Sequence, residues 1–368
     1  MNKDKGTARR RFLSYIADPD HSRPVISPFL PDERVVAQTL QTLGEQPIND
    51  NIANEIRLAS LLDYEPMFMS QFHELIFPWQ VDKELSTAEN EVSFIPLADG
   101  NWTKTIPRKV YSWNDDVPCP VQTEKDHFKL IAVCERISDQ EENIRTYFRD
   151  LRARVGDHGV IVAGHPHPSW LGYQINPQTI YYHYQDFPGT FQKSMQALFE
   201  AALFVIEIAI AEKLDFISDS SYGLEMTSPA LFLEMDLPWI QKFSAFAHER
   251  NSLFWYHNCG FTSELIKKGY FNQIGADVVE TLASPPEGDN DLAESRRHLH
   301  ASICSKGNFP LTLLRDGTVE QIEASCRFMV DQVRSSKHIY STADAVLQDT
   351  PPENFISLVR TLRQLTDK

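Results

Sequence analysis

The feature that most constrains the fold of this chain is a repeated alternation between two patterns. Short β-branched or aromatic runs have the composition of buried strands, and amphipathic stretches of helical period separate most of them. Repeated β/α units favour a parallel sheet that closes on itself, so we expect an α/β protein with the architecture of a (β/α)8 TIM barrel. The eight expected strands are 24–30, 92–96, 160–164, 215–218, 253–257, 277–282, 301–305 and 338–341.

The second of these strands has the weakest pattern. Residues 92–113 look more like a hairpin that turns at Asp99-Gly100-Asn101. Residues 1–90 are typical of a mostly helical N-terminal extension that includes the first strand. We therefore expect one barrel domain over 1–368, without a second independent domain.

Charge and composition exclude several classes of protein. The chain has 368 residues, of which 42% are hydrophobic, and its formal net charge is −16. A chain this acidic is a poor candidate for binding nucleic acid or an anionic membrane surface. The most apolar stretch, 197–213, carries Glu200, Glu207 and Glu212, which favours a buried helix over a membrane span.

The cysteines and the start of the sequence indicate the compartment. Five widely spaced cysteines do not form the pattern of a disulfide framework, and the charged start is not followed by an apolar signal segment. We expect a cytoplasmic protein that acts on a small molecule.

The sharpest candidate for chemistry lies at the end of the fifth expected strand. His257 and Cys259 are two residues apart, so in a strand both side chains point to the same side. Imidazole nitrogen and thiolate sulfur are ligands that zinc prefers, and Glu280 on the next strand supplies an oxygen ligand. The alternative is a histidine bonded to a backbone carbonyl beside a space-filling cysteine.

Other polar residues are expected at the same rim of the barrel, where reactive groups gather. His165 and His167 follow the third strand and are candidates for proton transfer or anion binding, or belong to an exposed loop. Asp219 follows the fourth strand as a candidate base, an orienting carboxylate or a turn residue. Asp344 follows the eighth strand as a further metal ligand or as plain loop polarity.

Longer motifs in the C-terminal part are specific as a set: YHNCG at 256–260, GADVVETLASPPEGDNDLAESRR at 275–297, KGNFPLTLLRDGT at 306–318 and STADAVLQDTPPENF at 341–355. Together they resemble the uroporphyrinogen decarboxylase superfamily, which implies a (β/α)8 barrel. WLGYQ at 170–174 and LDFISDSSYG at 214–223 also fit. We expect Tyr173 and Tyr222 within them to bind substrate.

The resemblance is closer to one branch than to another. True uroporphyrinogen decarboxylases are cofactor-free and grip the substrate carboxylates with an arginine-rich N-terminal segment, of which only Arg23-Pro24-Val25 is present here. The zinc-dependent methyltransferases place the metal on H-x-C, with a later Glu in some members. His257, Cys259 and Glu280 match this pattern.

The late cysteine of the coenzyme M enzymes is replaced here by Asp344, with Cys304 as the other residue that could complete the site. The function this favours is a zinc-dependent methyltransferase or demethylase that works with a separate corrinoid protein. In it, His165, His167 and Asp219 bind or orient the substrate. The alternatives are a metal-free decarboxylase or lyase on another carboxylic acid and a non-catalytic binding barrel. The resemblance also makes a homodimer an expectation.

Overall fold

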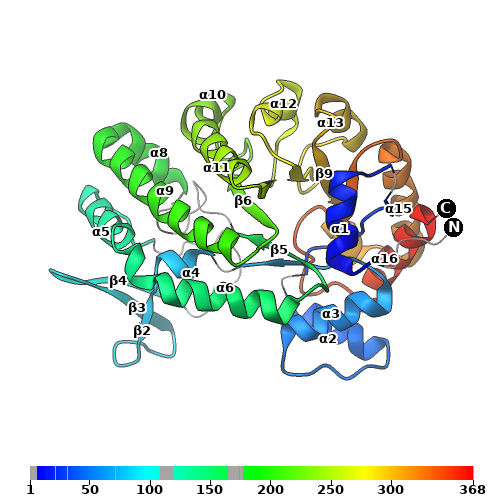
Figure 1. The fold of residues 1–368 in the computed structure, drawn as a ribbon, viewed down its shortest axis with the longest axis horizontal. Coiled ribbons are helices and arrows are strands. Elements are labelled where there is room, and N and C mark those ends of the chain that lie inside the picture. Colours follow the sequence, from blue (N-terminus) through cyan, green and yellow to red (C-terminus); the bar gives the residue numbers. More distant parts are fainter. Residues whose placement is uncertain are drawn as a thin grey trace. The chain divides into compact units, whose positions relative to one another are not determined.

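The computed structural model describes residues 6–20, 22–30, 32–70, 72–107, 119–164, 174 and 177–367. The chain divides into two compact units. Unit 1 comprises Met1–Ser70, Arg149–Val162 and Lys213–Lys368, and unit 2 comprises Gln71–Phe148 and Ala163–Glu212. The course of the chain can be followed in Figure 1. The sequence predicts one domain over 1–368, and this stays a prediction.

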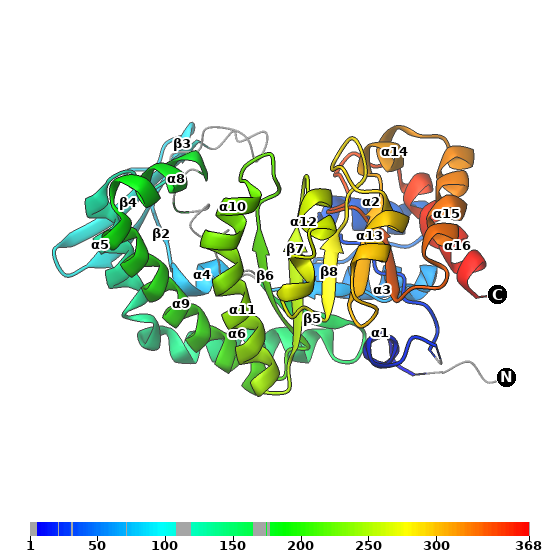
Figure 2. The same ribbon diagram turned by 90° about the horizontal axis from the view of Figure 1, so that it is seen from above.

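A curled sheet of seven strands is the framework of unit 1. Its order is β1-β5-β6-β7-β8-β9-β10, with parallel pairing between β1 and β5 and from β6 through β10. Figure 2 shows β6, β7 and β8 beside one another. The strands are β1 (Met67–Met69), β5 (Val160–Ala163), β6 (Phe216–Ser221), β7 (Leu253–Asn258), β8 (Val278–Thr281), β9 (Cys304–Phe309) and β10 (His338–Thr342).

Most of the expected strands are confirmed in this sheet. The strand expected at 301–305 begins three residues later, because β9 contains the buried polar residues Lys306 and Asn308, which a hydrophobic pattern excludes. The strand expected at 24–30 makes only two isolated parallel bridges, Ile26 to Tyr340 and Phe29 to Ala345. The α/β class with a curled parallel sheet is therefore observed, and closure into a full barrel stays a prediction.

The strand expected at 92–96 is not part of the parallel sheet, and that prediction is wrong. These residues lie in β3 (Asn90–Leu97), which pairs antiparallel with β4 (Gly100–Pro107) in a hairpin, while β2 (Gln80–Asp82) pairs with β3 on its other side. The expected hairpin is confirmed, but its turn is formed by Ala98-Asp99, because Gly100 and Asn101 already pair with Leu97 and Pro96. The place in the parallel sheet belongs to β1, whose three residues are too few to show a period.

The other elements of unit 2, within its described residues, are helices. The helix α9 is long and apolar enough to cross a membrane by length and composition, but 56% of its most apolar window is buried inside the fold. It packs against α4, α5 and α8. The helical segments are α4 (Phe72–Ile76), α5 (Glu124–Cys134), η1 (Ile137–Gln140), α8 (Pro177–Asp186) and α9 (Pro188–Ala211), and α6 (Glu141–Val155) runs from unit 2 into unit 1.

Unit 1 carries helices after most of its strands. Before the sheet come α1 (Ala8–Ala17), α2 (Glu33–Thr42) and α3 (Asn51–Leu62). Within and after it come α10 (Pro229–Leu231), the π-helical turn η2 (Phe232–Asp236), α11 (Leu237–Glu249), α12 (Ser263–Lys267), the 3₁₀ turn η3 (Phe271–Gln273), α13 (Leu292–His298), α14 (Leu311–Asp316), α15 (Val319–Val333) and α16 (Pro352–Thr366).

One apolar core cluster of unit 1 lies on one face of the sheet. The helix α1 contributes Phe12, Tyr15 and Ile16, and every strand of the sheet contributes at least one residue. Trp255, Val278 and Cys304 are the contributions of β7, β8 and β9. Because strand residues two apart share a face, the side chains of His257, Glu280 and Lys306 lie on the same face as this core.

One buried carboxylate ties three elements of unit 1 together. Asp215, whose side chain is fully buried, accepts hydrogen bonds from Arg9 Nε of α1 at 2.6 Å and from Arg152 Nη1 of α6 at 2.9 Å. It also accepts one from the backbone N–H of Ile161 in β5 at 2.9 Å. A buried carboxylate with three donors holds α1 and α6 against the start of β6.

Asp215→Asn removes this charge and leaves two guanidinium groups without their buried partner. We expect the free energy of unfolding to fall by about 3 kcal/mol, the scale of a broken buried ion pair. Asp157→Asn is the matched control, because Asp157 contacts the same Arg9 at 3.6 Å but is 64% exposed. This variant should change the free energy of unfolding by less than about 0.5 kcal/mol. Urea denaturation of both variants measures the difference, and equal losses would contradict the assigned role of Asp215.

Candidate metal centre

A row of polar side chains crosses four neighbouring strands of the sheet in unit 1. Ser220 on β6 pairs in register with His257 on β7, His257 with Glu280 on β8, and Glu280 with Lys306 on β9. Residues in lateral register on parallel strands point to the same face. The register therefore brings together residues that lie far apart in the sequence.

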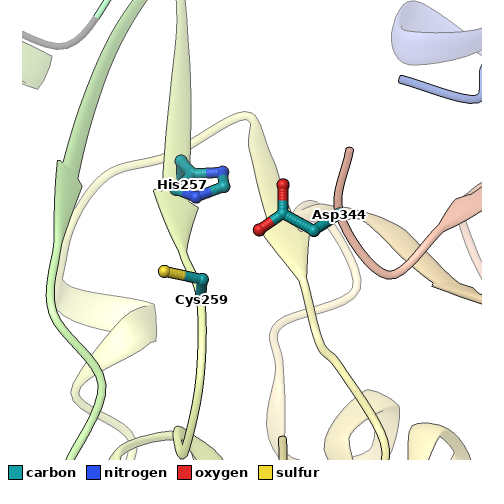
Figure 3. A group of neighbouring side chains, drawn as sticks. All are labelled: His257, Cys259 and Asp344. Carbon is teal, nitrogen blue, oxygen red and sulfur yellow. The ribbon is translucent and has the colours of Figure 1, made fainter. Parts of the chain in front are cut away.

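Around His257, the second member of this row, three side chains form a group that could hold a metal ion. The ligand atoms of His257, Cys259 and Asp344 all lie within 4.8 Å of one another, and each residue is partly exposed. Figure 3 shows His257 and Cys259 close together at the end of β7, with the Asp344 carboxylate directed toward them from the segment after β10. Nitrogen, sulfur and oxygen donors at this spacing are a zinc-type ligand set.

The His257 ring is held from behind by a carboxylate. Its Nδ1 lies 3.0 Å from Glu280 Oε1, and Glu280 Oε2 accepts a hydrogen bond from Lys306 Nζ at 2.8 Å. Glu280 and Lys306 are 3% and 2% exposed. In this arrangement Glu280 contacts the His257 ring through Nδ1 rather than joining the group of three.

Burial and charge act in opposite directions on these groups. Burial alone would lower the pKa of His257, but hydrogen bonds to Cys259 and Glu280 and the nearby Asp344 carboxylate outweigh it and raise the pKa well above its usual range. Burial alone would raise the pKa of Glu280, but the Lys306 ammonium and the His257 ring outweigh it and lower the pKa. Glu280 is therefore a carboxylate at neutral pH.

Two neighbouring loops hold the segment that carries Cys259. Leu224 N–H donates to the Phe261 carbonyl at 2.8 Å, and Phe261 N–H donates to Glu225 Oε2 at 2.8 Å. Gly260 has φ +80°, and a Cβ there would overlap the Glu225 carboxylate. Asp289 accepts the backbone N–H groups of Thr262 and Ser263 at 2.8 and 3.0 Å. A glycine is therefore required next to Cys259 while Glu225 keeps this position.

The structure places two of the other expected site residues, Asp219 and Cys304, away from this group. Asp219 is fully buried and pairs in register with Tyr256, so it points to the face of the sheet opposite to His257. Cys304 lies in the apolar core, and burial raises the pKa of its thiol to about 12. Tyr222 follows the end of β6 and is half-buried, and its carbonyl accepts a hydrogen bond from Asn258. His165, His167 and Tyr173 lie outside the described residues.

Sequence reasoning missed Lys306 and Ser220. Both are members of the row in register with His257, and neither stands at a recognisable motif position for catalysis. The sequence did contain a signal for Lys306, because this lysine directly follows the buried strand expected at 301–305. A charged residue in a buried strand predicts a buried partner of opposite charge.

A second polar cluster lies behind the row, between the sheet and the helices that follow β6. Asn258 Nδ2 donates to the hydroxyls of Ser221 at 2.6 Å and of Tyr256 at 3.1 Å. Asp236, at the end of η2, is near enough to help raise the pKa of Tyr256, after burial as the larger cause. Burial raises the pKa of Asp236 itself to about 8, so this carboxyl is neutral in the fold at neutral pH.

Comparison with known proteins gives the site a family. The model of the family described as uroporphyrinogen decarboxylase (URO-D) matches residues 180–365, just over half of the chain, and this range includes His257, Cys259, Glu280 and Asp344. The chain belongs to the uroporphyrinogen decarboxylase family. Among curated proteins, none matches this sequence.

Among solved structures, one shares the fold of this uroporphyrinogen decarboxylase family member over nearly its whole length. A methyltransferase from Methanosarcina mazei is similar with a TM-score of 0.66 and 14% identity, over 98% of this chain and 99% of that one. A B12-independent methionine synthase from Shewanella sp. W3-18-1 matches with a TM-score of 0.46 and 10% identity, over 94% of this chain and 98% of that one. The first likeness shows a shared fold.

The buried Asp236 gives the protein a defined dependence of stability on pH. Between pH 4 and 8 the carboxyl is ionised in the unfolded chain and neutral in the fold, so stability falls as the pH rises. We expect the free energy of unfolding of the wild type, relative to Asp236→Asn, to fall on the order of 2 kcal/mol from pH 5 to pH 7.

Urea denaturation at both pH values measures this difference. Asp331→Asn is the control, because Asp331 is 71% exposed and its removal should leave the pH dependence of the wild type intact. A difference between wild type and Asp236→Asn that is the same at both pH values would contradict a neutral buried carboxyl.

Proposed function

We propose that this protein is a zinc-dependent methyltransferase or demethylase of the uroporphyrinogen decarboxylase family, working with a separate corrinoid protein. The observation that carries the proposal is the convergence of His257, Cys259 and Asp344. We keep a cytoplasmic location, a small-molecule substrate and a homodimer as parts of the same proposal.

The donor set fits zinc. One imidazole, one thiolate and one carboxylate supply three ligands, which is the number found in catalytic zinc sites that keep a position open for substrate. The contact between His257 Nδ1 and Glu280 also fits, because ligand histidines in proteins commonly donate their second N–H to a carboxylate. When bound, zinc would act as a Lewis acid that lowers the pKa of a substrate thiol or alcohol.

The residues of the chain then have distinct tasks. His257, Cys259 and Asp344 would hold the ion, and all three are partly exposed. Glu280 keeps the His257 ring in one orientation and one tautomer. The loop pairing around Gly260 and Phe261 fixes the backbone next to Cys259. The methyl group arrives from outside, and a corrinoid carried by a partner protein is the donor we propose.

The decarboxylase alternative lacks comparable support. Asp219, the residue expected to stabilise a developing cation, points to the face opposite to His257. Arg23, the remaining trace of the arginine-rich segment, already pairs with Asp63 and Asp367 at 2.5 and 2.8 Å. A cation engaged by two carboxylates is a weak partner for a substrate carboxylate. The chemistry of the donor set therefore favours methyl transfer.

Elemental analysis of untagged protein tests the metal site. We expect about one equivalent of zinc in the wild type and its loss in His257→Ala and in Cys259→Ser, because each removes one of three ligands. His300→Ala and Cys119→Ser are matched controls at an exposed and a half-buried position, and should retain the metal. No zinc in the wild type under metal-replete conditions would contradict the proposal.

A methyl-transfer assay tests the reaction. Free methylcobalamin stands in for the corrinoid partner, with a panel of small thiols and alcohols as acceptors, and the cobalamin spectrum reports demethylation. We expect turnover in the wild type and a loss of about 100-fold or more in Cys259→Ser, since the Lewis acid contributes several kcal/mol. The Cys119→Ser protein should match the wild type, and equal turnover in all proteins would rule out this site.

A further inference from the structure

The lysine behind the site has no role in the function proposed so far. Lys306 lies on β9, is 2% exposed and pairs with Glu280 at 2.8 Å. A lysine this deeply buried is costly unless an opposite charge compensates it. The pair therefore holds both charges in place beneath the group of three ligands.

The two oxygens of Glu280 are both in use. Oε1 contacts His257 Nδ1 and Oε2 accepts from Lys306 Nζ. In register, Glu280 stands directly beside His257, at the distance of neighbouring strands. A carboxylate at this position would be a natural fourth ligand for an ion held by His257. A contact of opposite charge is therefore needed to hold the Glu280 carboxylate away from the ion.

We infer that Lys306 is the positioning residue that keeps Glu280 out of the metal's first coordination shell and so leaves one coordination position open for the substrate. This inference rests on the proposed function. The open position is thereby assigned to the ion pair between Glu280 and Lys306.

The pairing of Glu280 with Lys306 also sets the charge around the ion. Cys259 as thiolate and Asp344 as carboxylate together cancel the two positive charges of a zinc ion. The Glu280–Lys306 pair is neutral as a unit and adds nothing. The ion then keeps more Lewis acidity than with Glu280 as a third anionic ligand, which suits a substrate that must lose its proton on binding, such as a thiol.

A double-mutant cycle on zinc affinity tests the inference. Glu280→Gln is made in the wild type and in Lys306→Met, and competition with a chromophoric chelator gives the four dissociation constants. In the wild type the change should weaken zinc binding by about tenfold, the effect of an outer partner of a ligand. In Lys306→Met the loss should be about 100-fold or more, because the released carboxylate has become a ligand.

The outcomes distinguish a failure of the role of Lys306 from a failure of the proposed zinc-dependent function. Equal losses in both backgrounds, or a larger loss in the wild type, overturn the role of Lys306 while zinc binding itself stands. A wild type that binds no zinc overturns the proposed function and this inference with it. Lys267→Met, at a lysine 46% exposed on α12, is the control and should leave zinc affinity unchanged.

A second measurement avoids the risk that Lys306→Met does not fold. Cobalt replaces zinc in the wild type and in Glu280→Gln, and the visible absorption bands report the first coordination shell. The inference expects the same band positions in both proteins, since Glu280 is not a ligand while Lys306 is present. A shift of the bands in Glu280→Gln overturns it.

Discussion

The candidate site depends on one buried chain of contacts, from His257 through Glu280 to Lys306. Each residue belongs to a different strand, and the three meet because β7, β8 and β9 pair in parallel with this register. A shift of one residue in either pairing would place Glu280 or Lys306 on the opposite face. The geometry of the site therefore depends on the register of the sheet.

The register is in turn supported by the core on the same face. Trp255, Val278 and Cys304 lie two residues before His257, Glu280 and Lys306, and pack against Phe12, Tyr15 and Ile16 of α1. Asp215 fixes α1 and α6 to the sheet through two arginines. Apolar packing and one buried ionic anchor therefore set the strand positions, and the polar row follows from them.

Much of this arrangement could be predicted from local patterns. Strands with continuous β-branched or aromatic runs, such as 160–163 and 253–258, were predicted near their observed bounds. The spacing of His257 and Cys259 was enough to place both on one side of a strand. Pattern reasoning failed for β1, which is three residues long, and for β9, whose buried residues are polar.

The sequence by itself determined the α/β class, the ligand types available at 257 and 259, and the motifs that lead to the family. The tertiary structure decided which carboxylate joins them. Asp344 reaches His257 and Cys259 from the segment after β10, while Glu280 is turned toward Lys306 and Asp219 toward the opposite face. Contacts between side chains more than 80 residues apart depend on strand register and burial, which no local pattern contains.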